Sequence, residues 1–292
     1  MKKCLIVINY MSGHSNDVDQ KKLIGHFNEE YDVTVKELFS KKDDWTADGY
    51  DLVVVCGGDG TFNHAMNNNL PPEAKVVYYS CGTFNECAKA KGKKKKKADK
   101  ILLKEYSTVN NKFFSYVAAA GSFTPLGYVV SSEVKKHIGI FGYIFKVVSQ
   151  YKVYDIGAKI TADGLTYDGR YTIIMALDSM RCFGFRFNHL YKPDDGKVHL
   201  LLIKSPGADT FINKIKIFFP MFRAFFIGFR KEVYSKNLVF KGVENVNIKL
   251  EHPEVFNVDG EALKVVNEVD INVKKPQNGI YIGNFENIKK DK

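Results

Sequence analysis

Hydrophobic runs alternate with amphipathic segments along the first third of the chain. The runs have the length and composition of buried parallel strands, and the segments that follow have the apolar spacing of helices. The strand-like runs are residues 4–8, 52–56 and 76–79, and the helical segments are residues 23–30, 61–68 and 85–90. This alternation predicts an open α/β sheet. Ligands bind beyond the carboxyl ends of the strands in such sheets, so the loops at residues 9–13, 57–61 and 82–85 are expected to share one edge.

The pattern changes beyond about residue 113. One helical stretch, residues 129–151, is followed by short segments with β character. These are residues 158–161, 170–176, 198–203, 238–240, 246–250, 269–273 and 279–282. Asp163-Gly164 and Asp168-Gly169 favour hairpin turns between the first of them.

The change in pattern predicts two domains. Residues 1–110 are expected to form an open α/β domain, with the tail at about residues 283–292 packed back on it. Residues 111–282 are expected to form an antiparallel β-rich, β-sandwich-like domain.

Composition narrows the class of protein. The 292 residues are 45% hydrophobic and 26% charged, as in ordinary soluble proteins, and no apolar run reaches the roughly 18–20 residues of a membrane-spanning helix. The net charge of +10 favours an anionic partner, namely nucleic acid, acidic lipid or a phosphorylated small molecule. The lysine run Lys93–Lys97 is either a solvated loop or a membrane-facing patch. Five cysteines without metal-site spacing indicate a reducing compartment.

The segment GGDGT, from Gly57 to Thr61, directly follows a hydrophobic strand-like run. It is either a sharp strand-to-helix turn, with Thr61 as the helix N-cap, or a loop whose backbone N–H groups cradle phosphate. It matches neither GxGxxG nor GxxxxGK[ST], so neither a Rossmann dinucleotide site nor a Walker loop is supported.

Five segments together carry a family resemblance. They are GGDGT, CGTFNECA at residues 81–88, INYMSG at residues 8–13, KPDDGKVHLLLIK at residues 192–204 and FNVDGE at residues 256–261. In order and spacing they resemble the catalytic domain of the diacylglycerol kinase and lipid kinase family, particularly its soluble bacterial members, with sphingosine kinases and NAD kinases as relatives.

The resemblance implies an ATP site between the two domains, in which the GGDGT loop cradles the phosphates. The implied nucleotide-binding residues are Asn9, Ser12, Gly57, Gly58, Asp59, Gly60, Thr61, Asn63, Gly82, Thr83 and Asn85. It also implies a Mg²⁺ site in the second domain, formed by the Asp195 carboxylate with the carbonyl oxygens of Lys192 and Lys197.

The catalytic carboxylates implied by the resemblance are Asp59, Asp259 and Glu261, with Glu261 the favoured proton acceptor. Oxygen ligands suit Mg²⁺, and a carboxylate can take the proton of an acceptor hydroxyl. Considered alone, the Asp259-Gly260 pair is typical of an ordinary hairpin turn, and the GGDGT segment upstream favours the functional role.

Three positions depart from the family pattern: Tyr10 and Ser80 stand in place of prolines, and Glu86 in place of an aspartate. The leading hypothesis is an ATP- and Mg²⁺-dependent lipid kinase that converts diacylglycerol to phosphatidic acid. The alternatives are a kinase for a soluble metabolite such as NAD, and a catalytically weak protein that binds lipid or nucleotide. Nucleic-acid binding rests on charge alone and is not expected.

Residues 211–231 contain seven phenylalanines with interspersed Lys and Arg, and Pro220 is expected to divide them into two short pieces. The phenylalanines fit either a protein core or a membrane interface. The hypothesis implies a cytoplasmic protein in peripheral contact with an anionic membrane. It is compatible with a homodimer.

Overall fold

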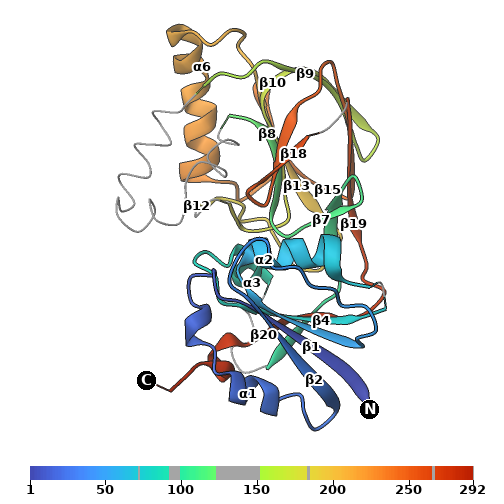
Figure 1. The fold of residues 1–292 in the computed structure, drawn as a ribbon. Helices are drawn as coiled ribbons and strands as arrows, with labels where there is room; N and C mark the ends of the chain where they lie inside the picture. The colour runs from blue at the N-terminus through green and yellow to red at the C-terminus, as the bar shows by residue number, and fades with distance from the viewer. Residues whose placement is uncertain (72, 92–98, 123–151, 183–184, 265–266, 292) are drawn as a thin grey trace. The chain divides into compact units, whose positions relative to one another are not determined.

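The computed structural model describes residues 1–71, 73–91, 99–122, 152–182, 185–264 and 267–291. The chain forms two compact units (Figure 1). Unit 1 consists of Met1–Tyr106 and Lys275–Lys292, and unit 2 consists of Ser107–Lys274. The predicted combination of an N-terminal α/β fold and a C-terminal antiparallel β-rich fold is confirmed.

Unit 1 is built on a six-stranded sheet in the order β2-β1-β3-β4-β20-β5. Its strands are β1 (Lys2–Asn9), β2 (Tyr31–Leu38), β3 (Leu52–Gly57), β4 (Lys75–Ser80), β5 (Lys100–Leu103) and β20 (Ile280–Gly283). Its helical segments are η1 (Ser15–Asp17), α1 (Gln20–Gly25), α2 (Asp59–His64), η2 (Ala65–Asn69), α3 (Glu86–Lys91) and η4 (Phe285–Ile288). The pairs are parallel except that β20 and β5 run antiparallel.

Alternate residues of the central strands fill the two faces of this sheet. Cys4, Ile6 and Ile8 of β1 belong to one apolar cluster, whereas Leu5 and Val7 belong to the other. This division follows from the two-residue repeat of a strand. Burial on both faces explains why the strands read as continuous hydrophobic runs. All five cysteines are buried free thiols.

The last strand of unit 1 comes from the C-terminal end of the chain. Ile280 of β20 lies opposite Val76 of β4 on one side and Leu103 of β5 on the other. Residues 275–282, which the sequence pattern placed in the second domain, therefore belong to unit 1. An apolar tetrapeptide fits either sheet, so its local sequence does not specify its partner.

Unit 2 contains a 12-stranded sheet with the main order β14-β15-β13-β10-β9-β16-β19-β6-β7, which β8, β17 and β18 extend. The strands are β6 (Tyr106–Val109), β7 (Lys112–Phe114), β8 (Val117–Gly121), β9 (Ile156–Ala162), β10 (Leu165–Leu177), β13 (Val198–Lys204), β14 (Val233–Tyr234), β15 (Leu238–Val243), β16 (Asn245–Leu250), β17 (Val255–Val258), β18 (Glu261–Lys264) and β19 (Glu268–Lys274). A separate two-stranded sheet joins β11 (Arg181–Cys182) to β12 (Phe185–Arg186).

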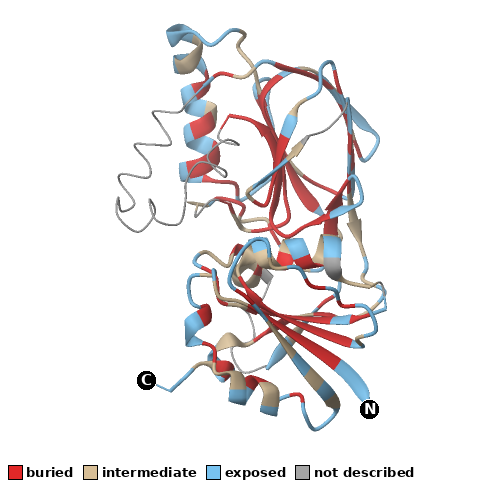
Figure 2. Ribbon diagram, in the orientation of Figure 1, coloured by how far each residue is buried: buried red, intermediate tan, exposed pale blue. Residues whose placement is uncertain are grey.

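The core of unit 2 also lies on two faces. Ile174 and Ala176 of β10 enter one cluster, and Ile173 and Met175 enter the other. The second cluster is covered by α6 (Phe211–Phe222) and its continuation η3 (Arg223–Ile227). Figure 2 shows a buried stripe along one side of this helical segment and exposed residues along the rest.

The hairpin predicted at Asp163-Gly164 is confirmed, since Ala162 and Leu165 pair across it. The turn predicted at Asp168-Gly169 is wrong, because both residues lie within β10 opposite β9. There the continuous ladder between the two strands outweighs the local turn preference. The helix predicted over residues 129–151 lies outside the described residues.

Pro220 does not divide the phenylalanine-rich segment, contrary to the sequence prediction. It lies inside α6, and the helical segment continues through η3 to Ile227. Proline removes one backbone donor, and the carbonyl that it leaves without that donor belongs to Lys216. Lys216 is exposed, so water can hydrogen-bond this carbonyl.

Candidate functional site

The loops that follow β1 and β3 are joined by side-chain hydrogen bonds. Asn9 Nδ2 donates to Thr61 Oγ1 at 2.8 Å, and Ser12 Oγ accepts from the backbone N–H of Gly58 at 3.1 Å. Both loops follow the carboxyl ends of neighbouring parallel strands, where the strand order predicts that they meet. The expected proximity of Asn9 and Ser12 to the GGDGT segment is therefore observed.

The loop after β4 packs against the same segment. The backbone N–H of Cys81 donates to the carbonyl of Gly57 at 2.8 Å. A Cβ atom on Gly82 would lie 2.5 Å from the Gly58 Cα, so the two backbones approach more closely than any other residue type would allow. A Cβ on Gly13 would lie 2.6 Å from Thr83 Oγ1, which brings the first and third loops together as well.

Gly60 differs from its neighbours. A Cβ on Gly57 would meet Thr61 atoms at 2.5–2.7 Å, whereas a Cβ on Gly60 would meet no atom within 4 Å apart from its chain neighbours and its own helix backbone. Gly60 is also exposed. The loop cluster is thus tightly packed at Gly57, Gly58 and Gly82, and its backbone is open to a ligand at Gly60.

Asn85 holds the third loop in shape. It adopts a left-handed backbone conformation (φ 52°). Its Oδ1 accepts from the N–H of Gly82 at 2.9 Å, and its Nδ2 donates to the carbonyls of Gly82 and Ser80 at 2.8 and 3.3 Å. These bonds give Asn85 a local structural role in addition to the predicted position beside a nucleotide. Asn63 accepts two bonds of 3.0 Å from Asn67 Nδ2, through its backbone and side-chain oxygens.

The Asp59 carboxylate accepts hydrogen bonds from the start of another helix. Its oxygens accept from the N–H groups of Glu86 at 2.7 Å and Cys87 at 3.2 Å, and from the Tyr78 hydroxyl at 3.3 Å. Asp59 therefore caps the first turn of α3 from a distant part of the chain. Burial, assisted by the Asp59 charge, raises the pKa of the Tyr78 hydroxyl well above its usual value, which keeps it a donor.

The helix after the glycine loop begins earlier than predicted. Gly58 is the N-cap and α2 begins at Asp59, so Thr61 lies in the first turn and is not the N-cap. The Thr61 hydroxyl oxygen instead accepts the hydrogen bond from Asn9 described above. Sequence reasoning missed Tyr78, whose ring stacks on Phe62 at 4.4 Å beneath the loop. The only signal for it was the pair of adjacent tyrosines, Tyr78 and Tyr79, at the end of a valine run.

The three departures from the family pattern are accommodated by packing. The Tyr10 ring stacks on Phe39 at 5.1 Å, and its hydroxyl accepts from Gln20 at 2.7 Å. The Ser80 carbonyl accepts from Asn85. The Glu86 side chain is only 2% exposed, so it is part of the packing around α3.

In unit 2, the segment predicted to bind metal forms a tight turn. Asp194 and Gly196 have φ of 59° and 74°, and the N–H of Lys197 donates to Asp195 Oδ1 at 3.2 Å. Burial raises the pKa of the Asp195 carboxyl, and the Lys197 N–H and nearby lysine charges oppose this change. The donor set of one carboxylate and the carbonyls of Lys192 and Lys197 consists of hard oxygens, which fits Mg²⁺. Across the residues that the structure describes, no cluster of three or more Asp, Glu, His or Cys could hold a metal.

The two carboxylates of the DGE segment have different environments. Val258 and Glu261 pair across a two-residue hairpin whose turn residues, Asp259 and Gly260, have φ of 53° and 99°. This is the geometry of a type I′ turn. Asp259 is buried, and its carboxylate accepts the N–H groups of Ser115, of Tyr116 at 3.0 Å and of Val117 at 3.0 Å.

Glu261 is exposed at the start of β18. Asp259 thus fixes the β7–β8 connection through these hydrogen bonds. Glu261 is the solvent-accessible carboxylate of the turn. Whether Glu261 takes a proton stays a prediction, as do the nucleotide and metal roles of the other residues.

Comparison with known proteins supports the predicted family. Residues 3–111 match the sequence profile described as "Diacylglycerol kinase catalytic domain". A diacylglycerol kinase from Staphylococcus carnosus is 24% identical over 242 residues, covering 79% of this chain and 74% of its own. A diacylglycerol kinase from Bacillus subtilis is 25% identical over 231 residues, covering 73% of this chain and 71% of its own.

The fold has a solved counterpart. A crystal structure of a diacylglycerol kinase from Bacillus anthracis superimposes with a TM-score of 0.65 at 16% identity, over 97% of each chain. This likeness extends the shared fold to both units. At this sequence identity the likeness shows the fold, and the profile match shows that residues 3–111 are similar to the diacylglycerol kinase catalytic domain.

Proposed function

We propose that this chain is an ATP- and Mg²⁺-dependent lipid kinase that transfers the γ-phosphoryl group to a lipid hydroxyl, with diacylglycerol as the acceptor. The observation that carries the proposal is the loop cluster at the carboxyl ends of β1, β3 and β4. Its glycines pack against one another at Gly58 and Gly82 but leave Gly60 open. Such a backbone can approach phosphate oxygens closely, and N–H groups at the start of a helix favour their negative charge.

The chemistry needs little from the protein beyond positioning and charge neutralisation. In unit 2, Asp195 and the carbonyls of Lys192 and Lys197 would hold Mg²⁺, which supplies positive charge when bound. Glu261, the exposed carboxylate, would accept the proton of the lipid hydroxyl as that oxygen attacks the γ-phosphorus. Asp259 would fix the turn that presents Glu261. Diacylglycerol is proposed as the acceptor because the relatives from Staphylococcus and Bacillus bear that name.

The test is transfer of radiolabelled phosphate from ATP to a panel of lipids in mixed micelles with Mg²⁺. We expect label in diacylglycerol, and at least about a hundredfold less with Glu261→Gln. The matched control is Glu244→Gln, a second exposed glutamate of unit 2. No label above background in any lipid with the wild type would contradict the kinase proposal, and equal labelling of diacylglycerol by wild type and Glu261→Gln would remove Glu261 as the proton acceptor.

The alternative of a kinase for NAD is tested in the same assay without detergent. If NAD is labelled and no lipid is labelled, the acceptor is NAD and not a lipid. The proposed nucleotide site would be unaffected by that result. Nucleotide binding without any transfer would support the alternative of a catalytically weak binding protein.

A further inference from the structure

The helical segment formed by α6 and η3 has one buried face and one exposed apolar face. Its buried residues, Ile217, Met221, Ala224 and Phe225, belong to the core cluster of unit 2. The exposed residues are also large and apolar. They are Phe211, Ile212, Ile215, Phe218, Phe219, Phe222, Phe226 and Ile227, with exposures between 42% and 78%.

The exposed residues form one stripe, which we call the phenylalanine face. Ile215, Phe218 or Phe219, Phe222 and Phe226 follow one another at three- and four-residue steps, the spacing of neighbours on one side of a helix. The Phe222 ring stacks on those of Phe218 and Phe226, with centroids 5.9 and 5.2 Å apart. A contiguous apolar surface of this kind is uncommon on a protein and marks an interaction site.

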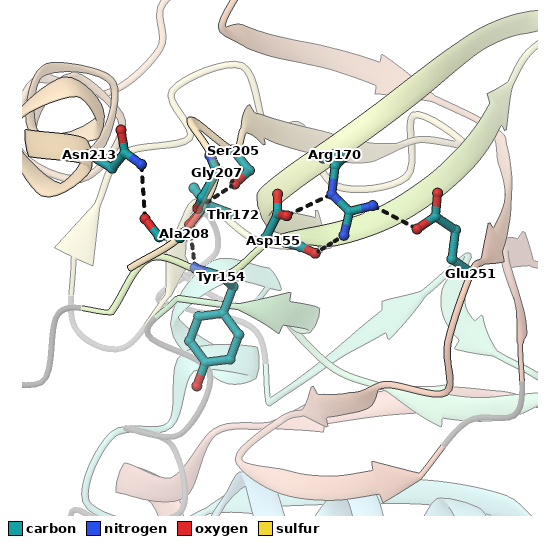
Figure 3. A network of polar contacts seen from close by, with 9 residues as sticks. All are labelled: Tyr154, Asp155, Arg170, Thr172, Ser205, Gly207, Ala208, Asn213 and Glu251. Carbon is teal, nitrogen blue, oxygen red and sulfur yellow. Dashed lines mark hydrogen bonds and ion pairs between the residues drawn. The ribbon is translucent and has the colours of Figure 1, made fainter. Parts of the chain in front are cut away.

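The phenylalanine face belongs to a helical segment that is fixed at both ends. At its start, the Thr210 hydroxyl accepts the N–H of Asn213, and Asn213 Nδ2 donates to the Ala208 carbonyl at 2.9 Å (Figure 3). Asp209 Oδ1 accepts the N–H of Val153 at 2.9 Å. At its end, Gly228 has φ 76°, and its N–H donates to the backbone carbonyl of Arg223 at 2.8 Å. The exposure of the rings is therefore a property of the folded state.

The loops near this anchor are tied to the sheet. Arg170 of β10 donates to Asp155 and Glu251, each at 2.7 Å, beside the Ser205–Gly207 turn that leads to α6 (Figure 3). All three side chains are substantially exposed, so the pairs contribute little to stability individually.

The helical segment that carries the phenylalanine face is predominantly basic, and the Asp209 carboxylate at its start pairs with Lys214 at 3.4 Å. Between Asp209 and Glu232 the sequence has five basic residues and no acidic one. Lys216 and Arg223 each follow a face residue by one position and are seven residues apart, so they lie along the same flank. The other three are Lys214, Arg230 and Lys231. An exposed apolar stripe flanked by cations matches the acyl chains and anionic head groups of a bilayer surface.

We infer that the phenylalanine face docks on the surface of an anionic lipid bilayer and inserts its rings among the acyl chains. A second copy of this chain fits less well, because a symmetric interface would bring the same predominantly basic flanks together. Crossing the bilayer is not the role of this segment, since within the described residues no helix is long and apolar enough to span a membrane. The inference concerns membrane binding only and does not depend on the kinase assignment.

The experiment is sedimentation with vesicles of phosphatidylcholine and phosphatidylglycerol, without ATP or diacylglycerol. We expect the wild type to co-sediment and Phe219→Gln/Phe222→Gln/Phe226→Gln to bind at least about tenfold more weakly. Glutamine is a good helix former, so these exposed substitutions should preserve the fold. The control is Leu165→Gln, which changes an exposed apolar residue at the β9–β10 hairpin and should bind as the wild type does.

A second readout places the face in the membrane directly. The chain has one tryptophan, Trp45, which is buried, so Phe219→Trp adds an identifiable signal. We expect its emission to shift to the blue with anionic vesicles and to be quenched by brominated acyl chains. No shift, or unchanged sedimentation of the triple variant, would overturn the inference. Loss of a dimer in the triple variant, without any change in vesicle binding, would also overturn it in favour of a second copy.

Failure of this inference is separable from failure of the proposed function. Vesicle binding is measured without catalysis, and lipid phosphorylation is measured in detergent micelles, where no bilayer is needed. A variant that labels lipid in micelles but does not bind vesicles would support both proposals.

Discussion

The Asp59 carboxylate accepts a 2.7 Å hydrogen bond from the backbone N–H of Glu86, 27 residues further along the chain. This bond connects the glycine loop after β3 to the first turn of α3. The aspartate of the GGDGT segment thus holds two loops of the candidate nucleotide site together, whatever it contributes to chemistry.

Asp59→Ala is expected to lower the free energy of unfolding by about 1–2 kcal/mol, because two N–H groups of α3 and the Tyr78 hydroxyl lose an acceptor. Asp59→Asn keeps one acceptor oxygen and should lose less. Urea denaturation of both variants measures the difference. Full stability of Asp59→Ala with abolished activity would assign Asp59 to the reaction and not to the loop.

Gly60→Ala tests whether a ligand lies against the open loop. A Cβ there meets no atom within 4 Å apart from its chain neighbours and its own helix backbone, and alanine is about 1 kcal/mol more favourable than glycine in a helix, so stability should not fall. Phosphate that contacts this backbone would be displaced, and we expect the ATP concentration for half-maximal activity to rise at least about tenfold. Gly25→Ala in α1, which is equally uncrowded, is the matched control. Unchanged ATP affinity in Gly60→Ala would remove Gly60 from the site.

Gly82→Ala, unlike Gly60→Ala, is expected to destabilise the protein. Its Cβ would lie 2.5 Å from the Gly58 Cα, so backbone must move, at a cost of about 1–3 kcal/mol. Thermal unfolding measures the loss. A melting temperature equal to that of the wild type would mean that the two loops separate without cost.

Substitutions of Glu261 and Asp259 are expected to have different effects. The first should lower activity, and the second should lower stability. Glu261→Gln changes an exposed residue and should leave the free energy of unfolding unchanged within about 0.5 kcal/mol while activity falls. Asp259→Ala leaves three backbone N–H groups without their acceptor and should cost about 3 kcal/mol or more. Chemical denaturation and activity are measured on the same samples. Destabilisation by Glu261→Gln would show that its side chain supports the turn.

His199 makes the stability of unit 2 depend on pH. Burial lowers the pKa of His199 to about 4, the ring stacks on Phe240 at 5.6 Å, and Nδ1 has no hydrogen-bond partner within the described structure. The unfolded chain, with a histidine pKa of about 6.5, binds this proton more readily, so stability falls as the pH decreases from about 6.5 to about 4. The loss is of the order of 3 kcal/mol.

Urea denaturation at several pH values measures this dependence. His199→Leu should flatten the slope between pH 6.5 and 4, relative to the wild type, because leucine does not titrate. The same slope in both proteins would assign it to other groups.

The hydrophobic pattern by itself determined the buried strands β1, β3 and β4, since buried parallel strands are apolar over their whole length. It missed β2, whose residues are mostly exposed or only partly buried. It also determined the Asp163-Gly164 hairpin, because that pair lies between segments that need a tight turn. The motifs indicated which loops would meet, because neighbouring parallel strands end at one edge of a sheet.

The partners of these segments were decided by tertiary structure. The insertion of β20 between β4 and β5, the capping of α3 by Asp59 and the clamping of the β7–β8 connection by Asp259 all join residues distant in sequence. The division of residues 211–227 into a packed face and an exposed face depended on where the sheet of unit 2 lies. Local sequence sets the conformations and apolar faces available to a segment. Which strands pair and which side chains are buried depends on all segments of the folded chain.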